Sequence, residues 1–332
     1  MAIIRCNKCA LLQEQPENLA GKKISCPRCG NATTVYPTLF YIEKLLDRYF
    51  VVQKELVSLR ASNGAATETT AVPAVAEPSP LADIDLGNTD QLASEVQHGP
   101  IYDWFHKRQI KVQANMRSVD TSGFFDEVAE AIGANLDILR EVLERIRWSQ
   151  QKEHASTLIH LDKKTPEEAS VISGFCQNLY DFSFVAKCFH NKPEKNIRLV
   201  LQTAPAIRHF FNGEWLEWHA LMTSLRYAKE RGRRFSCGRG LHIELQNGDT
   251  HELDVFVLID GQIPICIECK SGEFRQNIDH YLTMKKRLGI TSNHFVMCVA
   301  GLSDENAKAF TAMYDLAFTN ERSLANQLSR LF

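Results

Sequence analysis

The segment from His251 to Glu273 constrains the fold more than any other part of the chain. Its sequence is HELDVFVLIDGQIPICIECKSGE, in which two apolar runs flank the dipeptide Asp260-Gly261. Runs rich in Val and Ile favour β-strands, and Asp-Gly between two such runs is a strong signal for a hairpin turn. The segment therefore predicts a β-hairpin with an apolar second strand.

The length of the turn decides which side chains share a face of this hairpin. Glu268 and Lys270 share a face because side chains alternate along a strand. A two-residue turn would set Asp254 opposite Ile267, on the other face. A three-residue loop, or a bulge with Gly261 in a left-handed conformation, would set Asp254 opposite Glu268. We predict this second register.

Asp254, Glu268 and Lys270 are residue types that together indicate a polar site. Two carboxylates can hold a hard divalent cation through oxygen. A lysine beside them can orient a water molecule and balance the charge of a phosphate. The alternative is an ordinary exposed hairpin with scattered charges. A charged pair at the end of so apolar a strand favours a partly buried functional site.

Length, charge and cysteine usage bound the class of protein. With 332 residues the chain is long enough for two domains and attached segments. A formal net charge of −2 excludes a global basic field, so any nucleic-acid binding must be local. No apolar run is long enough to span a membrane, and the N-terminus lacks the pattern of a signal peptide. Most of the ten cysteines are scattered singly, which favours a reducing cytoplasm over a disulfide framework.

Four cysteines near the N-terminus form two CxxC pairs, Cys6 with Cys9 and Cys26 with Cys29. Two such knuckles complete a tetrahedral thiolate site for Zn²⁺, so residues 1–38 are predicted to form a zinc ribbon. A site with four thiolates is closed, which makes the role of Zn²⁺ structural. The ribbon could contact nucleic acid, dock a protein partner or serve as a structural cap.

The next two segments are predicted to join the ribbon to the rest of the chain. Residues 39–60 form a predicted helix whose apolar residues recur at spacings of three and four. This heptad seam is near the lower limit for a coiled coil, so the helix could form a homo-oligomer or pack against its own ribbon. Residues 61–98 contain no Lys or Arg and are rich in Ala, Thr, Pro and Glu, which predicts a disordered linker.

Residues 99–200 are predicted to be mainly helical. The stretch 125–144 has the layout of a helix-turn-helix, with apolar residues at core positions and Gly133 at the turn. Its second helix offers few of the lysines and arginines that phosphate contact favours, so a helical hairpin used only for packing is the preferred interpretation. A further helix is predicted from Thr165, and a short strand over 197–201.

Residues 201–332 are predicted to form an α/β domain. A helix from Glu214 to about Lys229 has a stripe of apolar residues, and Glu217 lies at the edge of that stripe. The elements expected after it are a strand near 241–245, the hairpin, a helix over 274–288, a strand over 294–300 and two terminal helices. This succession of helix, three strands, helix and strand indicates an α/β fold with the acidic hairpin in its sheet.

This order and these residues resemble the PD-(D/E)xK nuclease superfamily, whose restriction-endonuclease-like core has the order αβββαβ. The resemblance covers residues 212–300, about a quarter of the chain. Three short motifs carry it: Glu252-Leu253-Asp254 resembles the acidic strand, Glu268-Cys269-Lys270 the E-x-K motif, and Gly213-Glu214-Trp215-Leu216-Glu217 a Trp-Leu-Glu helix of one branch. One departure is that Gln276 and Tyr281 do not have the Gln-x-x-x-Tyr spacing of RecB-like members.

The resemblance implies a role for each matching residue. Asp254 and Glu268 would ligate Mg²⁺ or Mn²⁺, with the backbone carbonyl of Cys269 as a further ligand. Glu217 would hold or orient the metal shell. Lys270 would position the attacking water and stabilise the phosphorane.

The function that the resemblance implies is that of a metal-dependent endonuclease, with DNA as the favoured substrate over RNA, in defence or repair. The alternative is a non-catalytic adaptor that binds nucleic acid or docks a protein with a nuclease-like fold. A basic run at 285–287 could contact phosphates or form a solvated helix face.

Overall fold

The computed structural model describes residues 2–5, 11–38, 92, 94–119 and 123–331. The chain divides into two compact units, residues 1–75 and 76–332. The helix predicted over 39–60 and most of the linker predicted over 61–98 lie outside the described residues. None of the described helices has both the length and the apolar composition needed to cross a membrane.

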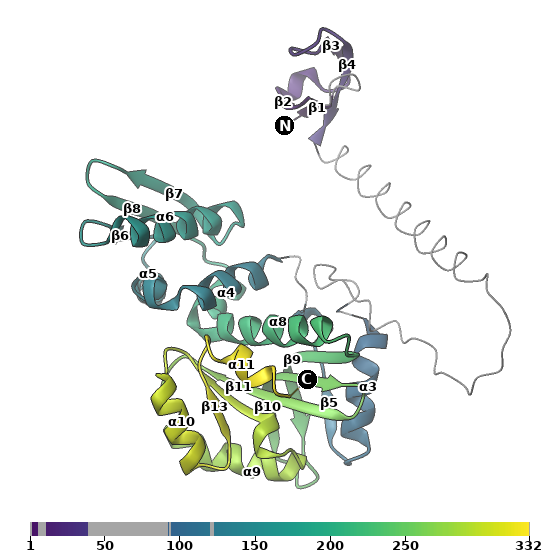
Figure 1. Cartoon of the computed structure of the whole chain (residues 1–332). Coiled ribbons are helices and arrows are strands. Elements are labelled where there is room, and N and C mark those ends of the chain that lie inside the picture. The colour runs from purple at the N-terminus through teal and green to yellow at the C-terminus, as the bar shows by residue number, and fades with distance from the viewer. Residues whose placement is uncertain (1, 6–10, 39–91, 93, 120–122, 332) are drawn as a thin grey trace, which may run out of the picture. The chain divides into compact units, whose positions relative to one another are not determined.

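The first unit contains a small antiparallel sheet (Figure 1). Its strand order is β2-β1-β4-β3, built from β1 (Ala2–Arg5), β2 (Leu12–Gln15), β3 (Lys23–Ser25) and β4 (Ala32–Pro37). Among its described residues, the buried apolar cluster consists of Ala2, Ile4 and Val35, with three partly buried residues packed against it. Small sheets with so few buried residues are often stabilised by a metal or another cross-link.

The second unit is built on a six-stranded mixed sheet with the order β13-β12-β11-β10-β9-β5. The strands β11, β12 and β13 are parallel, and the other neighbours are antiparallel. The six strands are β5 (Lys111–Gln113), β9 (Phe235–Glu244), β10 (Thr250–Ile259), β11 (Ile263–Lys270), β12 (Phe295–Val299) and β13 (Ala317–Thr319).

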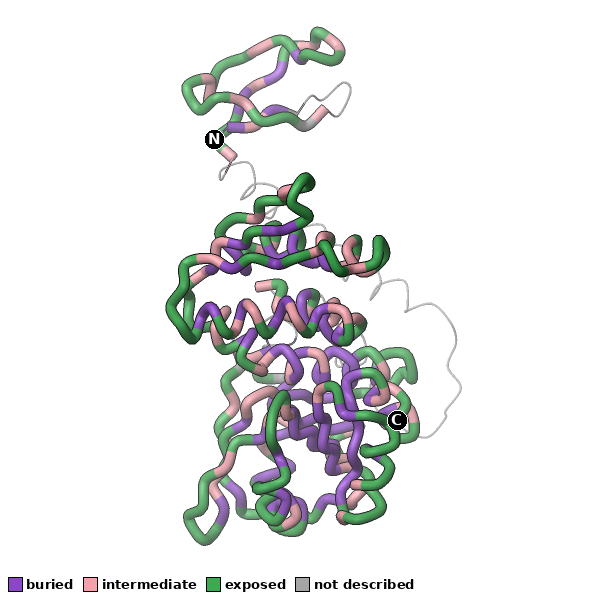
Figure 2. Tube along the Cα trace, turned by 90° about the vertical axis from the view of Figure 1, so that its left-hand side faces the viewer, coloured by how far each residue is buried: buried purple, intermediate pink, exposed green. Residues whose placement is uncertain are grey.

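Helices bury both faces of this sheet, which confirms the α/β class (Figures 1 and 2). On one face pack α8 (Trp215–Glu230) and α11 (Leu324–Leu328). On the other pack α3 (Glu95–His106), α9 (Ile278–Leu288) and α10 (Asp304–Met313). The strands at the centre of the sheet are apolar on both faces for this reason.

The N-terminal boundary of α3 corrects the predicted linker. Residues 95–98 were assigned to the linker, yet they form the first turn of α3, and His98 is fully buried. The helix begins at this point because the Ser94 side chain accepts a hydrogen bond from the backbone N–H of Gln97, at 3.3 Å.

Residues 123–201 form a second layer against α8. The helices are α4 (Phe125–Ala134), α5 (Leu136–Gln151) and α6 (Pro166–Asp181). The strands β6 (Ser156–His160), β7 (Val185–Asn191) and β8 (Asn196–Leu201) form an antiparallel sheet of order β6-β8-β7. The helices share one apolar core with α8 and the large sheet, and α4 and α5 bury the positions expected of a packing hairpin.

The prediction of a mainly helical region over 99–200 was therefore incomplete. It identified α4, α5, α6 and the strand β8, but it missed β6 and β7. Both are edge strands of a sheet with one exposed face, and neither sequence shows the regular alternation of apolar and polar residues that predicts a strand. One strand of this region, β5, pairs with β9 and so belongs to the large sheet.

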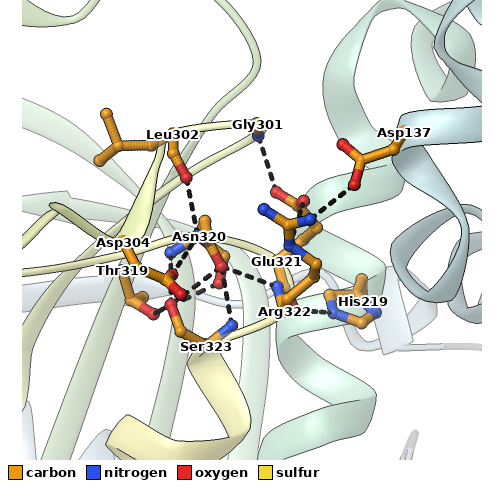
Figure 3. Close-up of polar contacts among 10 residues, drawn as sticks. All are labelled: Asp137, His219, Gly301, Leu302, Asp304, Thr319, Asn320, Glu321, Arg322 and Ser323. Atoms are coloured by element: carbon orange, nitrogen blue, oxygen red, sulfur yellow. Dashed lines mark hydrogen bonds and ion pairs between the residues drawn. The ribbon is translucent and has the colours of Figure 1, made fainter. Parts of the chain in front are cut away.

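A buried polar network at the end of β13 joins the large sheet to the layer formed by residues 123–201 (Figure 3). The amide of Asn320 donates to the carbonyl of Leu302 at 2.7 Å and to Asp304 at 2.8 Å, and its oxygen accepts from the backbone N–H of Ser323 at 2.7 Å. Beside it, Glu321 is fully buried and accepts a hydrogen bond from the backbone N–H of Gly301 at 2.7 Å. Buried polar groups tied together in this way fix one arrangement of the surrounding loops.

Replacing Asn320 with Ala is expected to lower the free energy of unfolding by about 2–4 kcal/mol, because the buried carbonyl of Leu302 and several partly buried groups would lose a hydrogen bond. Urea denaturation of the purified chain measures this change. The matched control is Asn326→Ala, since Asn326 is an exposed residue of α11. Equal stability of the two variants would contradict a structural role for the network.

Candidate active site

The hairpin formed by β10 and β11 has the register predicted from the sequence. Val255 pairs with Ile267 and Ile259 pairs with Ile263, which leaves residues 260–262 as a three-residue loop. Gly261 in this loop has a φ of +70°, the left-handed conformation that the bulged turn requires. Continuing the ladder by one residue places Asp254 at the level of Glu268.

Three of the predicted site residues meet at this point. Oδ2 of Asp254 accepts hydrogen bonds from Nζ of Lys270 at 2.8 Å and from the backbone N–H of Cys269 at 2.7 Å. Nζ of Lys270 also lies 3.4 Å from Oε2 of Glu268. The two carboxylates therefore share one ammonium group, and a main-chain bond fixes the position of Asp254.

A local irregularity of β10 directs the Asp254 side chain. Leu253 and Val255 are two residues apart, yet they pack on opposite faces of the sheet. The ladder with β9 pairs both of them but omits Asp254. Gly240, the residue of β9 at the same level, has a φ of +60°. This bulge-like break in the alternation places the Asp254 carboxylate between the two faces of the sheet. Groups from both faces can therefore approach it.

Glu217 approaches Asp254 from the first turn of α8. Its carboxylate accepts a hydrogen bond from Nη1 of Arg239 at 2.9 Å, and its side chain is 19% exposed. Burial, followed by the negative charge of Asp254, raises the pKa of Glu217 to about 8. Because the charge of Asp254 contributes to this raised pKa, Glu217 interacts electrostatically with the hairpin site.

Arg239 is a site residue that the sequence did not reveal. Its Nε donates to the carbonyl of Ser118 at 2.8 Å, and its guanidinium lies over the ring of Trp218, 4.6 Å from the centroid. These contacts hold the cation against Glu217 and, at 3.7 Å, near Glu214. The one feature of the sequence that could have indicated a role for Arg239 is its position as a basic residue inside the mainly uncharged strand FSCGRGL.

Charge determines the protonation of the hairpin residues. Glu268 is buried, and both burial and the charge of Asp254 raise its pKa. Burial by itself would lower the pKa of Lys270, but the charges of Asp254 and Glu268 outweigh that effect and raise it. Lys270 therefore stays protonated. The centroid of the Tyr281 ring lies 5.5 Å from Nζ of Lys270. After Arg239, Tyr281 is the second residue of the site to which no role was assigned from the sequence.

The donor atoms fit a hard divalent cation. Carboxylate oxygens are the ligands that Mg²⁺ and Mn²⁺ prefer. In the part of the chain that the structure describes, Glu217, Asp254 and Glu268 form ion pairs with two cations, Lys270 and Arg239, so the fully ionised cluster carries an excess of negative charge. Within the described residues, no three His, Cys, Asp or Glu side chains are already spaced to hold a metal ion. In the arrangement that the structure shows, Lys270 forms ion pairs with Asp254 and Glu268 and offsets part of their negative charge.

The predicted zinc site lies only partly within the described residues. Cys26 is buried and Cys29 is partly exposed, and the backbone N–H of Gly30 bonds to the carbonyl of Cys26 at 2.8 Å. This tight turn has the form of one metal knuckle. Cys6 and Cys9 lie outside the described residues, so the tetrathiolate site stays a prediction.

The basic run at 285–287 does not form a uniform cationic face. Lys285 is buried, and its Nζ bonds to Ser292 at 3.1 Å and to Asp315. Arg287 pairs with Asp249 at 2.7 Å. Only Lys286 projects from α9 as an exposed cation without a described partner. Lys285 therefore serves the packing of α9.

Comparisons with known proteins identify no family for this chain. No family model matches it, and no curated protein matches it. Two solved structures are similar to it over 70% of its length: protein VC1899 from Vibrio cholerae, with 15% identity and a TM-score of 0.48, and Can2 from Sulfobacillus thermosulfidooxidans in complex with cyclic tetra-adenylate, with 16% identity and a TM-score of 0.47. The chain covers 60% of the first and 58% of the second, less than two thirds of either.

The raised pKa of Glu217 predicts how stability depends on pH. In the unfolded chain this carboxyl loses its proton near 4.5, whereas in the folded chain it keeps the proton up to about 8. The folded state binds more protons in this window, so the free energy of unfolding should fall as pH rises through it, by a few kcal/mol because one pKa unit corresponds to about 1.4 kcal/mol. Denaturation in EDTA between pH 5 and pH 8.5 measures the slope. Glu217→Gln should reduce the slope, with the raised pKa of Glu268 contributing the remainder, and an unchanged slope would contradict the assignment.

Proposed function

We propose that this chain is a divalent-metal-dependent nuclease whose active site is formed by Asp254, Glu268 and Lys270. The observation that carries the proposal is the meeting of these three side chains at Nζ of Lys270, within 2.8 Å and 3.4 Å of the two carboxylates. The hairpin, together with a helix on each side, supports a restriction-endonuclease-like core. DNA is the favoured substrate.

In this proposal Asp254 and Glu268 hold Mg²⁺ or Mn²⁺, with Glu217 and the carbonyl of Cys269 as further ligands. When bound, the cation would polarise a phosphoryl oxygen and lower the pKa of a water molecule. The backbone N–H of Cys269 orients Asp254, and Arg239 orients Glu217. Lys270 is held protonated, so it can donate hydrogen bonds to the attacking water and to the phosphate as negative charge develops.

The ribbon has a separate proposed role. Cys6, Cys9, Cys26 and Cys29 would bind Zn²⁺, which would add to the stability that the small core of the first unit provides. The ribbon would dock nucleic acid or a protein partner, and residues 39–60 would contribute to a homo-oligomer. Atomic absorption for zinc and the molar mass of a chain lacking residues 1–60 test these two statements.

Incubation with supercoiled plasmid tests the nuclease function. We expect nicked and linear products with Mg²⁺ or Mn²⁺ and none in EDTA. Parallel reactions with single-stranded DNA and with RNA define the substrate class. Absence of metal-dependent cleavage of all three substrates would contradict the proposal.

One observation favours a second candidate, a non-catalytic adaptor that binds nucleic acid or docks a protein. The close pair of Lys270 and Asp254, without a ready-made set of three metal ligands among the described residues, is also what a structural ion pair would show. The two candidates differ in their response to Mn²⁺. A nuclease site binds the ion through Asp254 and Glu268, whereas a structural ion pair does not.

A further inference from the structure

The small sheet of β6, β8 and β7 has one covered face and one open face (Figures 1 and 2). The covered face is buried in the apolar core with α5 and α6 through residues such as Ile159, Ile197 and Leu199. We call the opposite face the outer face. The strand registers define it as three rows that run across the sheet: Ser156, Val200 and Lys187; Leu158, Arg198 and Phe189; His160, Asn196 and Asn191.

The middle row combines an aromatic ring with a guanidinium group. Phe189 and Leu158 lie directly opposite Arg198, one on each side of it. The Phe189 side chain is 52% exposed and Leu158 is 36% exposed. Opposite residues on neighbouring strands have Cβ atoms about 5 Å apart, so the three side chains form one continuous surface. Phe side chains are usually buried in folded proteins, so a half-exposed Phe on an edge strand is unusual.

The outer face carries more positive than negative charge. Lys187 and Arg198 are exposed cations, and His160 adds an exposed imidazole. None of the nine residues is acidic, and among the described residues the one carboxylate bonded to them is that of Glu194, which accepts a hydrogen bond from the Asn196 amide at 3.0 Å at one end of the face. An aromatic ring beside cations complements a polyanion that also offers flat π-faces.

We propose that the outer face binds single-stranded nucleic acid. A base would stack on Phe189, and Arg198 and Lys187 would contact the flanking phosphates. An unpaired base is required, because stacking on a ring in a sheet face needs a base that has left the double helix. The proposal goes beyond cleavage, since binding at this face uses none of the hairpin residues and needs no metal ion.

Fluorescence anisotropy in EDTA tests this proposal without any cleavage. The probes are labelled twelve-residue oligothymidine and oligouridine, with a labelled DNA duplex of the same length as comparison. We expect the full chain to bind the single strands more tightly than the duplex. The relative affinity of the two single strands shows whether DNA or RNA is the preferred ligand.

Phe189→Ala should weaken binding by between about 5-fold and 150-fold, the range found for loss of one stacked base. Phe189→Trp should retain binding. Arg198→Gln should lower the slope of log affinity against log salt by about 0.7, the value for one phosphate contact with a single strand. The matched control is Tyr180→Ala, which removes a similarly exposed ring on α6, outside the outer face.

Three results would overturn the proposal. One is equal affinity of the wild type and Phe189→Ala. Another is binding of the duplex as tightly as the single strands. The third is an absence of oligonucleotide binding combined with a molar mass that falls in Phe189→Ala, which would assign the outer face to self-association. Because the assay contains EDTA, an inactive nuclease site would leave the expected binding unchanged.

Discussion

Asp254→Asn is expected to reduce metal-dependent cleavage by about a thousandfold or more. The substitution keeps the shape of the side chain and an oxygen that can accept the hydrogen bond from the backbone N–H of Cys269. It removes the negative charge that Lys270 contacts and that a cation needs. A bound metal contributes several kcal/mol of transition-state stabilisation, and about 4 kcal/mol corresponds to a thousandfold in rate. Plasmid nicking followed over time with Mn²⁺ measures the change.

Two further readouts show whether this loss has the stated cause. Calorimetric titration with Mn²⁺ should show weaker binding to Asp254→Asn than to the wild type. The pKa of Glu217 should fall, because the charge of Asp254 helps to raise it. The control is Asp279→Asn, a change of the same kind at an exposed position of α9. A variant with wild-type cleavage would remove Asp254 from the site.

Lys270→Met is expected to separate chemistry from metal binding. Methionine retains most of the apolar stem but cannot donate a hydrogen bond or balance charge on the phosphate. Cleavage should fall by roughly a hundredfold or more, the usual cost of losing one preorganised hydrogen-bond donor to the developing charge. Binding of Mn²⁺ should be retained or become tighter, since the ammonium 2.8 Å from Asp254 competes with a cation for the same carboxylate.

The comparison for Lys270→Met is Lys308→Met, which changes an exposed lysine of α10. Cleavage and Mn²⁺ titration are measured on both variants at the same pH. Loss of Mn²⁺ binding in Lys270→Met would show that the lysine supports the fold of the hairpin instead of its chemistry. Unaltered cleavage would exclude Lys270 from catalysis.

Local rules explain which parts of the site could be predicted from the sequence. The register of the hairpin follows from the period of two along a strand and from the turn that Gly261 permits. Glu217 follows from the helical spacing of the apolar residues around it, which places it beside the buried stripe of α8. Both statements rest on residues that are close to one another in sequence.

The missed features depend on contacts between distant segments. Arg239 reaches Glu217 and Ser118 only after β9 has been placed beside α8. The pairing of β5 with β9 joins residues more than a hundred positions apart, across a boundary drawn from composition. The strands β6 and β7 gain their burial from α5 and α6, so their own sequences carry little signal.

The boundary between the predicted linker and α3, and the predicted zinc site, also show what local sequence can indicate. The lack of basic residues continues past Ser94, but Ser94 is a good helix cap, and α3 begins directly after it. The zinc prediction rests on spacing alone, because half of its ligands lie outside the described residues. The fold of the second unit does not depend on that site.

The central claim is that Asp254 and Glu268 bind a divalent cation beside Lys270. Crystals soaked in Mn²⁺ and measured at the manganese absorption edge test it most directly. The claim predicts an anomalous peak within bonding distance of both carboxylates, with Nζ of Lys270 displaced from Asp254. A soaked crystal without a peak at this position, and with Lys270 still bonded to Asp254, would contradict it.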